Sequence, residues 1–434
     1  MSKLIGGEII GQGTYGCVHK PQMECESSPS RADTVSKILL DAKADAELAE
    51  FAAVATADPT QTIHLGTPTK CAIKETRDNI HAIDECNNSG LTDTTFYPNK
   101  LSDYALLVMK DGGQDLTTFG EVIYRSAATS ENQNKMELFW LEVSRLFYGL
   151  KVFKDAGIVH HDITQNNVVY NINANRLNFI DFGLMTKPKD IVEDARNGKG
   201  YRRWWSLPWE ISDFSYAKYF AYLKANDSHA PRVMPAIADE YDDFFQLILP
   251  DVQPEEVAAI KTMMSRKYNE QINSYSKHNY AKRINESIDT RDSYGVGLTL
   301  LYILNRSRHL IGSDFGDKLN ALFANMISPL VSERYSVNVL IAEYNKIMTE
   351  SGLLAKHNKH YDDNFLLVNV EPAVEDKEVP QTPTVQPPVP PEPVVPGGRY
   401  RPRSRKSKTA RRCKMTKRMR SRKANKAKRS NKKR

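Results

Sequence analysis

The chain has 434 residues, of which 40% are hydrophobic, enough for a real core. It lacks an apolar run of the roughly 18–20 residues that a membrane-spanning helix needs, and residues 1–10 lack the features of a signal peptide, which argues against a membrane-spanning or secreted class. The net charge of +7 is segregated, because residues 399–434 hold 20 Lys and Arg and no Asp or Glu, while the preceding residues carry −13. An acidic globular body and a basic tail therefore need separate explanations.

The first 100 residues predict a small mixed region. Residues 1–40 have the pattern strand, glycine turn, strand, strand, and Asp41–Ala57 is rich in Ala and Glu, which predicts a helix ending before an Asp-Pro pair. Residues 60–100 are polar and irregular, and we expect loops and short strands there. The compact apolar stretch Tyr104–Met109 predicts one more strand.

The rest of the chain predicts helices and then an extended end. Apolar residues recur at helical spacing over Met136–Phe153, which predicts one core helix. Residues 211–290 are expected to be mostly helical and polar, and residues 292–350 to form two or three further helices. Residues 380–396 contain eight prolines, which predicts an extended spacer without a core. The basic tail, residues 399–434, is expected to be disordered alone.

The cysteines are odd in number and scattered, so they do not suggest a disulfide framework. We expect free thiols in a reducing compartment. A zinc site is the alternative, although no close Cys-x-x-Cys pair supports it. Its candidate ligands are Cys25, Cys71 and Cys86, with His64 or His81.

A glycine pattern near the start of the chain is the first feature that suggests phosphate chemistry. Gly11, Gly13, Gly16 and Val18 fit G-x-G-x-x-G-x-V, in which glycines let the backbone turn sharply and approach phosphates closely. A simple hairpin turn would explain the same residues. Strand-like residues on both sides favour a hairpin over a Rossmann turn, which would need a helix next.

A lysine on the following strand extends this hypothesis. Lys37 lies in Val-Ser-Lys-Ile, where a lysine could hold the α- and β-phosphates of ATP, although a surface lysine is the alternative reading. Its expected partner is a glutamate on the next helix. We favour Glu50 over Glu47, because three apolar residues behind Glu50 form the expected buried face.

Two acidic motifs at a fixed spacing are the most specific signal. Asp162 and Asn167 fit H-x-D-x-x-x-x-N, and Asp181 begins Asp-Phe-Gly nineteen residues after Asp162. Asp162 would accept the proton of a substrate hydroxyl and orient that hydroxyl. Asn167 and Asp181 would bind magnesium, which prefers hard oxygen ligands.

Over residues 5–350 the chain resembles the eukaryotic-type protein kinase superfamily. The resemblance implies an α+β, bilobal fold with a β-rich N-lobe at 1–110 and a helical C-lobe at 111–350, interrupted by a helical insertion at about 211–290. A proline-rich linker at 373–398 and the basic tail would follow. ATP and Mg²⁺, or Mn²⁺, are the implied cofactors.

Further positions acquire roles through this resemblance. Glu210 resembles the glutamate that ends the activation segment, Arg334 the late arginine that pairs with it, and Asp292 the aspartate that braces the catalytic loop. Met109 would be the gatekeeper residue beside the adenine, and Asp115 would reach the ribose.

Two residues depart from the family pattern. His161 replaces the usual arginine before the catalytic aspartate, which weakens any claim of switching by loop phosphorylation, although a protonated histidine could partly substitute at acidic pH. Thr164 replaces the lysine usual in serine/threonine kinases, which puts rate or residue specificity in doubt. The glycine-rich start and the polar insertion in the N-lobe are similar to kinases of large cytoplasmic DNA viruses. That similarity implies an intracellular location, in the host cytoplasm or nucleus or packaged in the virion.

The tail alternates cations with small polar residues and has one aromatic residue, so phosphate neutralisation rather than base stacking would bind DNA or RNA. A nuclear localisation signal, an anionic membrane surface and a role in solubility alone are the alternatives. The cations that represent it are Arg399, Arg411, Arg412, Lys417, Arg418 and Arg434.

Together these features predict an active serine/threonine protein kinase held on nucleic acid by its tail, with basic or nucleic-acid-associated proteins as substrates. The competing hypotheses are a pseudokinase that binds or packages nucleic acid through the tail, and a small-molecule kinase of the same superfamily. The intact Lys37, Asp162, Asn167 and Asp181 favour the first hypothesis.

Overall fold

The computed structural model describes most of the chain before the proline-rich stretch. The chain divides into two compact units, residues 1–372 and 373–434, and the second unit lies outside the described residues. The residues that the structure describes are 7–13, 16–88, 94–196, 253–273 and 280–370.

The N-terminal part is built on a five-stranded antiparallel sheet with the order β1-β2-β3-β5-β4. Strand, glycine turn, strand and strand follow one another as predicted, and β5 is the predicted apolar strand lengthened by one residue. The strands are β1 Glu8–Gly13, β2 Gly16–Lys20, β3 Thr34–Leu40, β4 Thr69–Cys71 and β5 Tyr104–Lys110.

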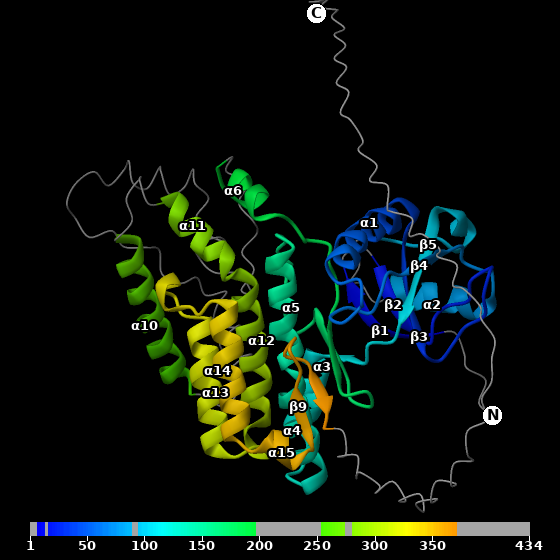
Figure 1. Cartoon of the computed structure of the whole chain (residues 1–434). Helices are drawn as coiled ribbons and strands as arrows, with labels where there is room; N and C mark the ends of the chain where they lie inside the picture. The colour runs from blue at the N-terminus through cyan, green and yellow to red at the C-terminus, as the bar shows by residue number, and fades with distance from the viewer. Residues whose placement is uncertain (1–6, 14–15, 89–93, 197–252, 274–279, 371–434) are drawn as a thin grey trace, which may run out of the picture. The chain divides into compact units, whose positions relative to one another are not determined.

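Helices cover both faces of this sheet (Figure 1). Because neighbouring residues of a strand point to opposite faces, Ile38 packs in the cluster that includes α2 (Arg77–Asn88), whereas Leu39 packs in the cluster that includes α1 (Asp41–Ala57). The helix α1 has the predicted bounds. The helix α2 corrects the expectation of loops and short strands at residues 60–100, and a short 3-10 helix, η1 (Pro98–Asp103), follows it.

The C-terminal part begins with three helices, α3 (Leu116–Tyr124), α4 (Ser130–Glu142) and α5 (Ser144–Asp155). The prediction of one helix over Met136–Phe153 was wrong, because the structure divides it at Val143 into α4 and α5. Both helices bury one face in the large hydrophobic core.

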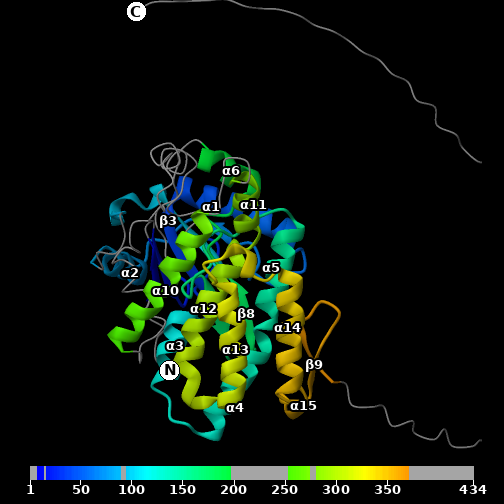
Figure 2. The ribbon, with the colours of Figure 1, turned by 90° about the vertical axis from the view of Figure 1, so that its left-hand side faces the viewer.

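The centre of the helical part is α12 (Arg291–Ser307), whose side chains are nearly all buried. A helix that is apolar around most of its circumference belongs inside a domain, and α13 and α14 pack alongside it in turn (Figure 2). These are the helices predicted after residue 292. The remaining helices are α6 Pro188–Arg196, α10 Pro254–Asn273, α11 Tyr280–Asp289, α13 Ser313–Met326, α14 Val337–Glu350 and α15 Leu353–Lys356, with 3-10 turns η2 Arg308–Leu310 and η3 Val331–Glu333.

Two small antiparallel sheets complete the helical part. One has the order β6-β7-β8 and flanks the candidate catalytic loop, and the other pairs β9 with β10 after α15, beyond the expected end of the C-lobe at residue 350. Their strands are β6 Gln114–Asp115, β7 Val168–Asn171, β8 Arg176–Phe179, β9 Lys359–Tyr361 and β10 Leu367–Asn369.

The observed fold is therefore α+β and bilobal, with a β-rich N-terminal lobe and a helical C-terminal lobe, as the sequence predicts. Of the predicted insertion, α10 and α11 are described, and residues 197–252 lie outside the described part. Among the described helices, none is both long enough and apolar enough to cross a membrane.

Candidate active site

The glycine turn joins two paired strands, as a hairpin requires. In the register of β1 and β2, Gly13 faces Gly16 and Gly11 faces Val18, and residues 14–15 between them are outside the described part. A Cβ at Gly16 would lie 1.8 Å from the carbonyl oxygen of Ile38, so close strand packing requires glycine there. A Cβ at Gly13 would meet nothing within 4 Å, so packing within the described structure does not require that glycine.

Lys37 lies on β3 opposite Val18 of β2, and its side chain is mostly buried. Its Nζ donates to Glu47 Oε2 at 2.7 Å, so the expectation that Glu50 is its partner was wrong. Burial alone would lower the pKa of Lys37, but the charges of Glu47 and Asp181 outweigh burial and raise it. The lysine is therefore held as a cation.

Glu50 lies one helical turn from Glu47 and faces the same acidic surroundings. Burial and the neighbouring charges of Glu47 and Asp181 raise the pKa of Glu50. A Cβ built at Gly183 would lie 3.6 Å from Glu50 Oε2 and 3.2 Å from Asp181 Oδ1. Glu50 thus lies beside the Asp-Phe-Gly segment, and Glu47 neutralises the lysine.

Asp162 and Asn167 are joined within the loop that precedes β7. Asn167 Nδ2 donates to Asp162 Oδ2 and to the Asp162 carbonyl oxygen, both at 2.9 Å. Burial and the charge of Asp181 raise the pKa of Asp162, which identifies Asp181 as a close electrostatic neighbour. The structure thus brings together the three polar residues that the sequence selected from separate motifs.

The oxygen donors fit the magnesium site that the sequence predicts. Asn167 uses its amide nitrogen on Asp162, and no described residue donates to its Oδ1. Asp181 adds a carboxylate whose charge acts on Asp162, and its backbone lies in the left-handed region at φ 58°, where aspartate is tolerated. Hard oxygen donors of this kind suit Mg²⁺ or Mn²⁺.

Asp292, at the start of α12, holds the candidate catalytic loop by its backbone. Its Oδ2 accepts from the backbone N of His160 at 2.8 Å, and its Oδ1 accepts from the backbone N of His161 at 3.0 Å. His161 has φ 74°, a backbone conformation that costs energy for a residue other than glycine. The two hydrogen bonds to Asp292 hold the loop in that conformation.

His161 cannot act as the charged substitute that the sequence allowed. It is 3% exposed, and burial, together with the charges of Arg291 and His160, lowers its pKa to about 2. The histidine is therefore neutral throughout the physiological range, which corrects that expectation. Thr164, in the position of the usual lysine, is buried, and its Oγ1 accepts from the backbone N of Asn166 at 3.3 Å.

A series of packed aromatic rings connects the candidate catalytic loop to α1. The Phe182 ring lies 5.3 Å from that of Phe51 on α1 and 5.2 Å from that of His160. All three side chains are buried. This packing turns Phe182 inward beneath α1.

The remaining predicted positions have mixed outcomes. Met109 lies on β5, is partly buried and packs against the hydrophobic cluster that Leu39 forms with α1. Asp115 caps α3, because its carboxylate accepts from the backbone N and the hydroxyl of Thr118 at 2.9 and 2.8 Å. Glu210 lies outside the described residues. Arg334 is buried and donates through Nε to the Ser328 carbonyl oxygen at 2.7 Å.

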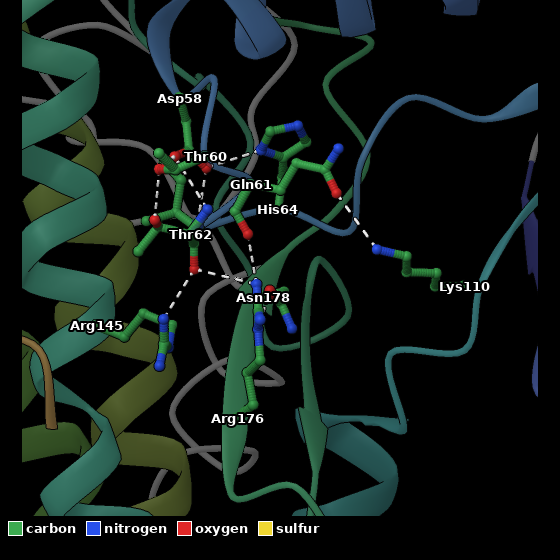
Figure 3. Close-up of polar contacts among 10 residues, drawn as sticks. Asp58, Thr60, Gln61, Thr62, His64, Lys110, Arg145, Arg176 and Asn178 are labelled. Carbon is green, nitrogen blue, oxygen red and sulfur yellow. Dashed lines mark hydrogen bonds and ion pairs between the residues drawn. The ribbon is translucent and has the colours of Figure 1, made fainter. Parts of the chain in front are cut away.

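A polar turn that the sequence does not predict connects α1 to the helical lobe (Figure 3). Asp58, at the end of α1, accepts from the backbone N of Thr62 and Ile63 and is 2.8 Å from His64 Nδ1. Burial alone would raise the pKa of Asp58, but these hydrogen bonds lower it to about 2. The turn is thus organised around a buried carboxylate.

The carbonyl oxygens of this turn bind residues of the helical lobe. Arg145 Nη1 donates to the Thr62 carbonyl oxygen at 2.9 Å, and Arg176 donates to that of Gln61. The backbone N of Phe179 donates to the Ile63 carbonyl oxygen at 2.9 Å. Since β8 ends at Phe179, Asp181 follows this attachment point by two residues.

The cysteines correct the sequence analysis most directly. Cys17 is bonded to Cys86, and Cys25 to Cys71, so four of the five are not free thiols. A cysteine in a disulfide cannot supply a thiolate to zinc, and no group of three or more His, Cys, Asp or Glu in the described part of the chain could hold a metal. The zinc alternative is therefore excluded for these cysteines.

The comparisons with known proteins add two similar solved structures. No protein-family model and no curated protein matches the chain. The chain is similar to the kinase domain of a Toxoplasma gondii specific rhoptry antigen, with 13% identity, a TM-score of 0.42, and coverage of 81% of this chain and 82% of that one. It is also similar to the ROP18 kinase domain in complex with AMP-PNP and sucrose, with 11% identity, a TM-score of 0.40, and coverage of 80% and 81%. We carry no residue role over from either.

Proposed function

We propose that the chain is a protein kinase that transfers the γ-phosphate of ATP to serine or threonine hydroxyls of proteins. The observation that carries this proposal is the joining of Asp162 and Asn167 by the Asn167 amide, with Asp181 as the neighbouring charge. Lys37, paired with Glu47, supplies a fixed cation in the same surroundings.

Each of these side chains has a task in the proposed reaction. The oxygen of the substrate hydroxyl bonds to the γ-phosphorus while the bond from that phosphorus to the β,γ-bridging oxygen breaks, leaving ADP. Asp162 orients the hydroxyl and takes its proton, Lys37 binds phosphate oxygens, and Asn167 and Asp181 offer oxygen donors to a metal. Mg²⁺, when bound, would neutralise charge on the phosphates.

An intact set of polar groups also bears on the pseudokinase alternative. A chain that had lost catalysis would have no need to keep Asp162, Asn167, Asp181 and the Lys37 pair together. We therefore favour catalysis over a vestigial fold, and protein over small-molecule substrates because the sequence has an activation-segment-like end and a bracing Asp292.

The basic tail extends the proposal. We propose that residues 399–434 hold the enzyme on DNA or RNA, near basic or nucleic-acid-associated substrates, because 20 cations without an acidic residue make a strong electrostatic footprint. We also propose a host cytoplasmic, nuclear or virion location, because the glycine-rich start and the polar insertion in the N-lobe resemble those of kinases of large cytoplasmic DNA viruses.

The test is incorporation of radiolabelled phosphate from ATP into a panel of basic proteins and into the chain itself, with sites mapped by mass spectrometry. Asp162→Asn should lower incorporation by about 10²–10⁴-fold while ATP-analogue binding persists. Asp181→Ala should remove the dependence on Mg²⁺ together with the activity. Incorporation that persists in the Asp162→Asn protein would contradict the mechanism.

A further inference from the structure

The helix α2 is attached to the strand β2 at two matched points. Cys17 and His19 alternate with Val18 along β2, and both are completely buried. Cys17 is bonded to Cys86 of α2, and His19 Nε2 lies 3.4 Å from the carbonyl oxygen of Ala82, one helical turn earlier. Two residues of a strand span about 6.6 Å and four residues of a helix about 6 Å, so the two attachments match in spacing.

One of these attachments is next to the glycine turn. Gly16 directly precedes Cys17, and Cys17 faces Gln12 across the hairpin. Val18, on the other side of Cys17, pairs with Lys37. The disulfide is therefore one residue from Gly16 of the expected phosphate cover. It is also one residue from Val18, which pairs with Lys37 on the neighbouring strand.

The face that receives α2 is a true core. It contains buried residues of β2, β3, β5 and α2, together with Phe96, which stacks edge-on against Tyr104 at 5.1 Å. A second disulfide, between Cys25 and Cys71, lies in the same cluster but away from the glycine turn. Asn79 ties this region together through its hydrogen bonds with Glu24 and Lys74. The chain therefore contains an internal control: one disulfide adjoins the turn and the other does not.

We propose that the Cys17–Cys86 disulfide is a positioning device for the glycine turn, and that its reduction weakens ATP binding. The proposal rests on the proposed function, since it assigns the turn to the phosphates of ATP. A thiol reductant supplies two electrons and two protons, the S–S bond breaks, Cys17 and Cys86 become thiols, and the reductant is oxidised to its disulfide. Reoxidation by a disulfide oxidant reverses the step.

Covalent attachment matters because binding needs the turn in one arrangement. With the bond present, β2 is attached to α2 covalently at Cys17 as well as by the His19 contact. With the bond broken, only non-covalent contacts join the two elements, namely the His19 contact and the packing of their shared core. If the competent arrangement were then populated a tenth to a third of the time, the apparent Kd would rise by about three- to tenfold.

The first measurement is peptide mapping of the full chain under non-reducing conditions. We expect a Cys17–Cys86 cross-linked peptide, and its absence from protein prepared under oxidising conditions would overturn the proposal. This result does not depend on whether the chain is a kinase.

The second measurement is the Kd of a non-hydrolysable ATP analogue, with and without dithiothreitol. The wild type should lose about three- to tenfold in affinity on reduction, and the Cys17→Ser/Cys86→Ser protein should be equally weak in both conditions. The matched control, Cys25→Ser/Cys71→Ser, keeps the bond beside the turn and should still respond to dithiothreitol. Circular dichroism of each protein checks that it is folded.

The outcomes separate the two proposals. Binding that is tight in both redox states, with the cross-link mapped, would overturn the positioning role and leave the kinase proposal intact. A full response in the Cys17→Ser/Cys86→Ser protein would assign the effect to the other disulfide and would also overturn it. Absence of binding in every protein would contradict the proposed function itself.

Discussion

Lys37 Nζ lies 2.7 Å from Oε2 of Glu47, and in the described part of the chain it forms no hydrogen bond or ion pair with Glu50. The two glutamates are three residues apart on α1, so both face the sheet, and only the register of the helix against β3 decides between them. That register places the first of the two on the lysine.

The pair predicts different effects for two matched substitutions. Glu47→Gln should lower kcat/KM for ATP by about ten- to a hundredfold, because it removes a hydrogen bond between charged groups worth about 1.5–3 kcal/mol. Glu50→Gln should have little effect, because Glu50 lies in acidic surroundings where its charge is disfavoured. Steady-state kinetics measures both, and an equal loss in the two proteins would contradict the assignment.

Asp58 predicts an acid limit to stability. Its pKa is lowered to about 2 from its ordinary value of 3.8, so the folded protein binds the proton more weakly than the unfolded chain does. The resulting stabilisation is complete above about pH 4 and is lost as the pH falls through the folded pKa near 2, a loss of about 2 kcal/mol.

Urea unfolding between pH 5 and pH 2 measures this effect. An Asp58→Asn protein, which cannot ionise there, should lack this component of the pH dependence. If the free energy of unfolding depended on pH equally in the wild type and in the Asp58→Asn protein, the carboxylate would not organise the turn.

Replacing Arg145, which forms a buried ion pair with Glu142, should lower the stability of the protein strongly. Its partner, Glu142, is 1% exposed and also accepts from the backbone N of Leu177. Arg145→Met should lower the free energy of unfolding by about 3–5 kcal/mol, because it leaves a buried carboxylate without its cation. The same substitution should lower activity, since the hydrogen bond from Arg145 to the turn that follows α1 is lost as well.

The neighbouring helix offers a matched control. Lys135 pairs with Glu131 on the exposed surface of α4, and Lys135→Met should change the free energy of unfolding little, because water screens exposed charges. Guanidinium or urea titration gives both values. Similar losses in the two variants would mean that burial does not distinguish the pairs.

The basic tail predicts salt-sensitive binding to nucleic acid. If six to ten of its cations contact phosphates, affinity for duplex DNA should fall by about 10³–10⁵-fold between 50 and 200 mM salt. Deleting residues 399–434 should abolish retention while phosphorylation of a small peptide continues. Filter binding at several salt concentrations tests this, and binding by the truncated chain at low salt would assign the contact to another surface.

Much of the N-terminal lobe was predictable because its signals are local. The helix α1 ends at Ala57, just before an Asp-Pro pair, and the glycines of β1 and β2 mark the turn between them. The helix α2 was missed although its buried residues recur at helical spacing, because three of the four are small or polar and all lie in a polar stretch. Those residues are Asn79, Ala82, Ile83 and Cys86.

Other features depend on tertiary structure and leave no pattern in the sequence. The break between α4 and α5 falls at Val143, which is neither glycine nor proline. The disulfide partners are 69 and 46 residues apart, and only the fold determines which cysteines meet. The three polar residues Asp162, Asn167 and Asp181 were identifiable because this chemistry restricts both residue type and spacing.

The helix on the second face of the sheet has a practical consequence for expressing this domain. In the sequence, residues 72–103 are polar and irregular like a surface loop, so they would be an obvious choice for deletion from a shortened lobe. Such a protein would expose Ile38, Leu106 and Tyr104 to water at once, since they belong to the cluster that α2 and its flanks cover. We expect insoluble protein from that deletion, so the smallest soluble catalytic fragment must retain the segment.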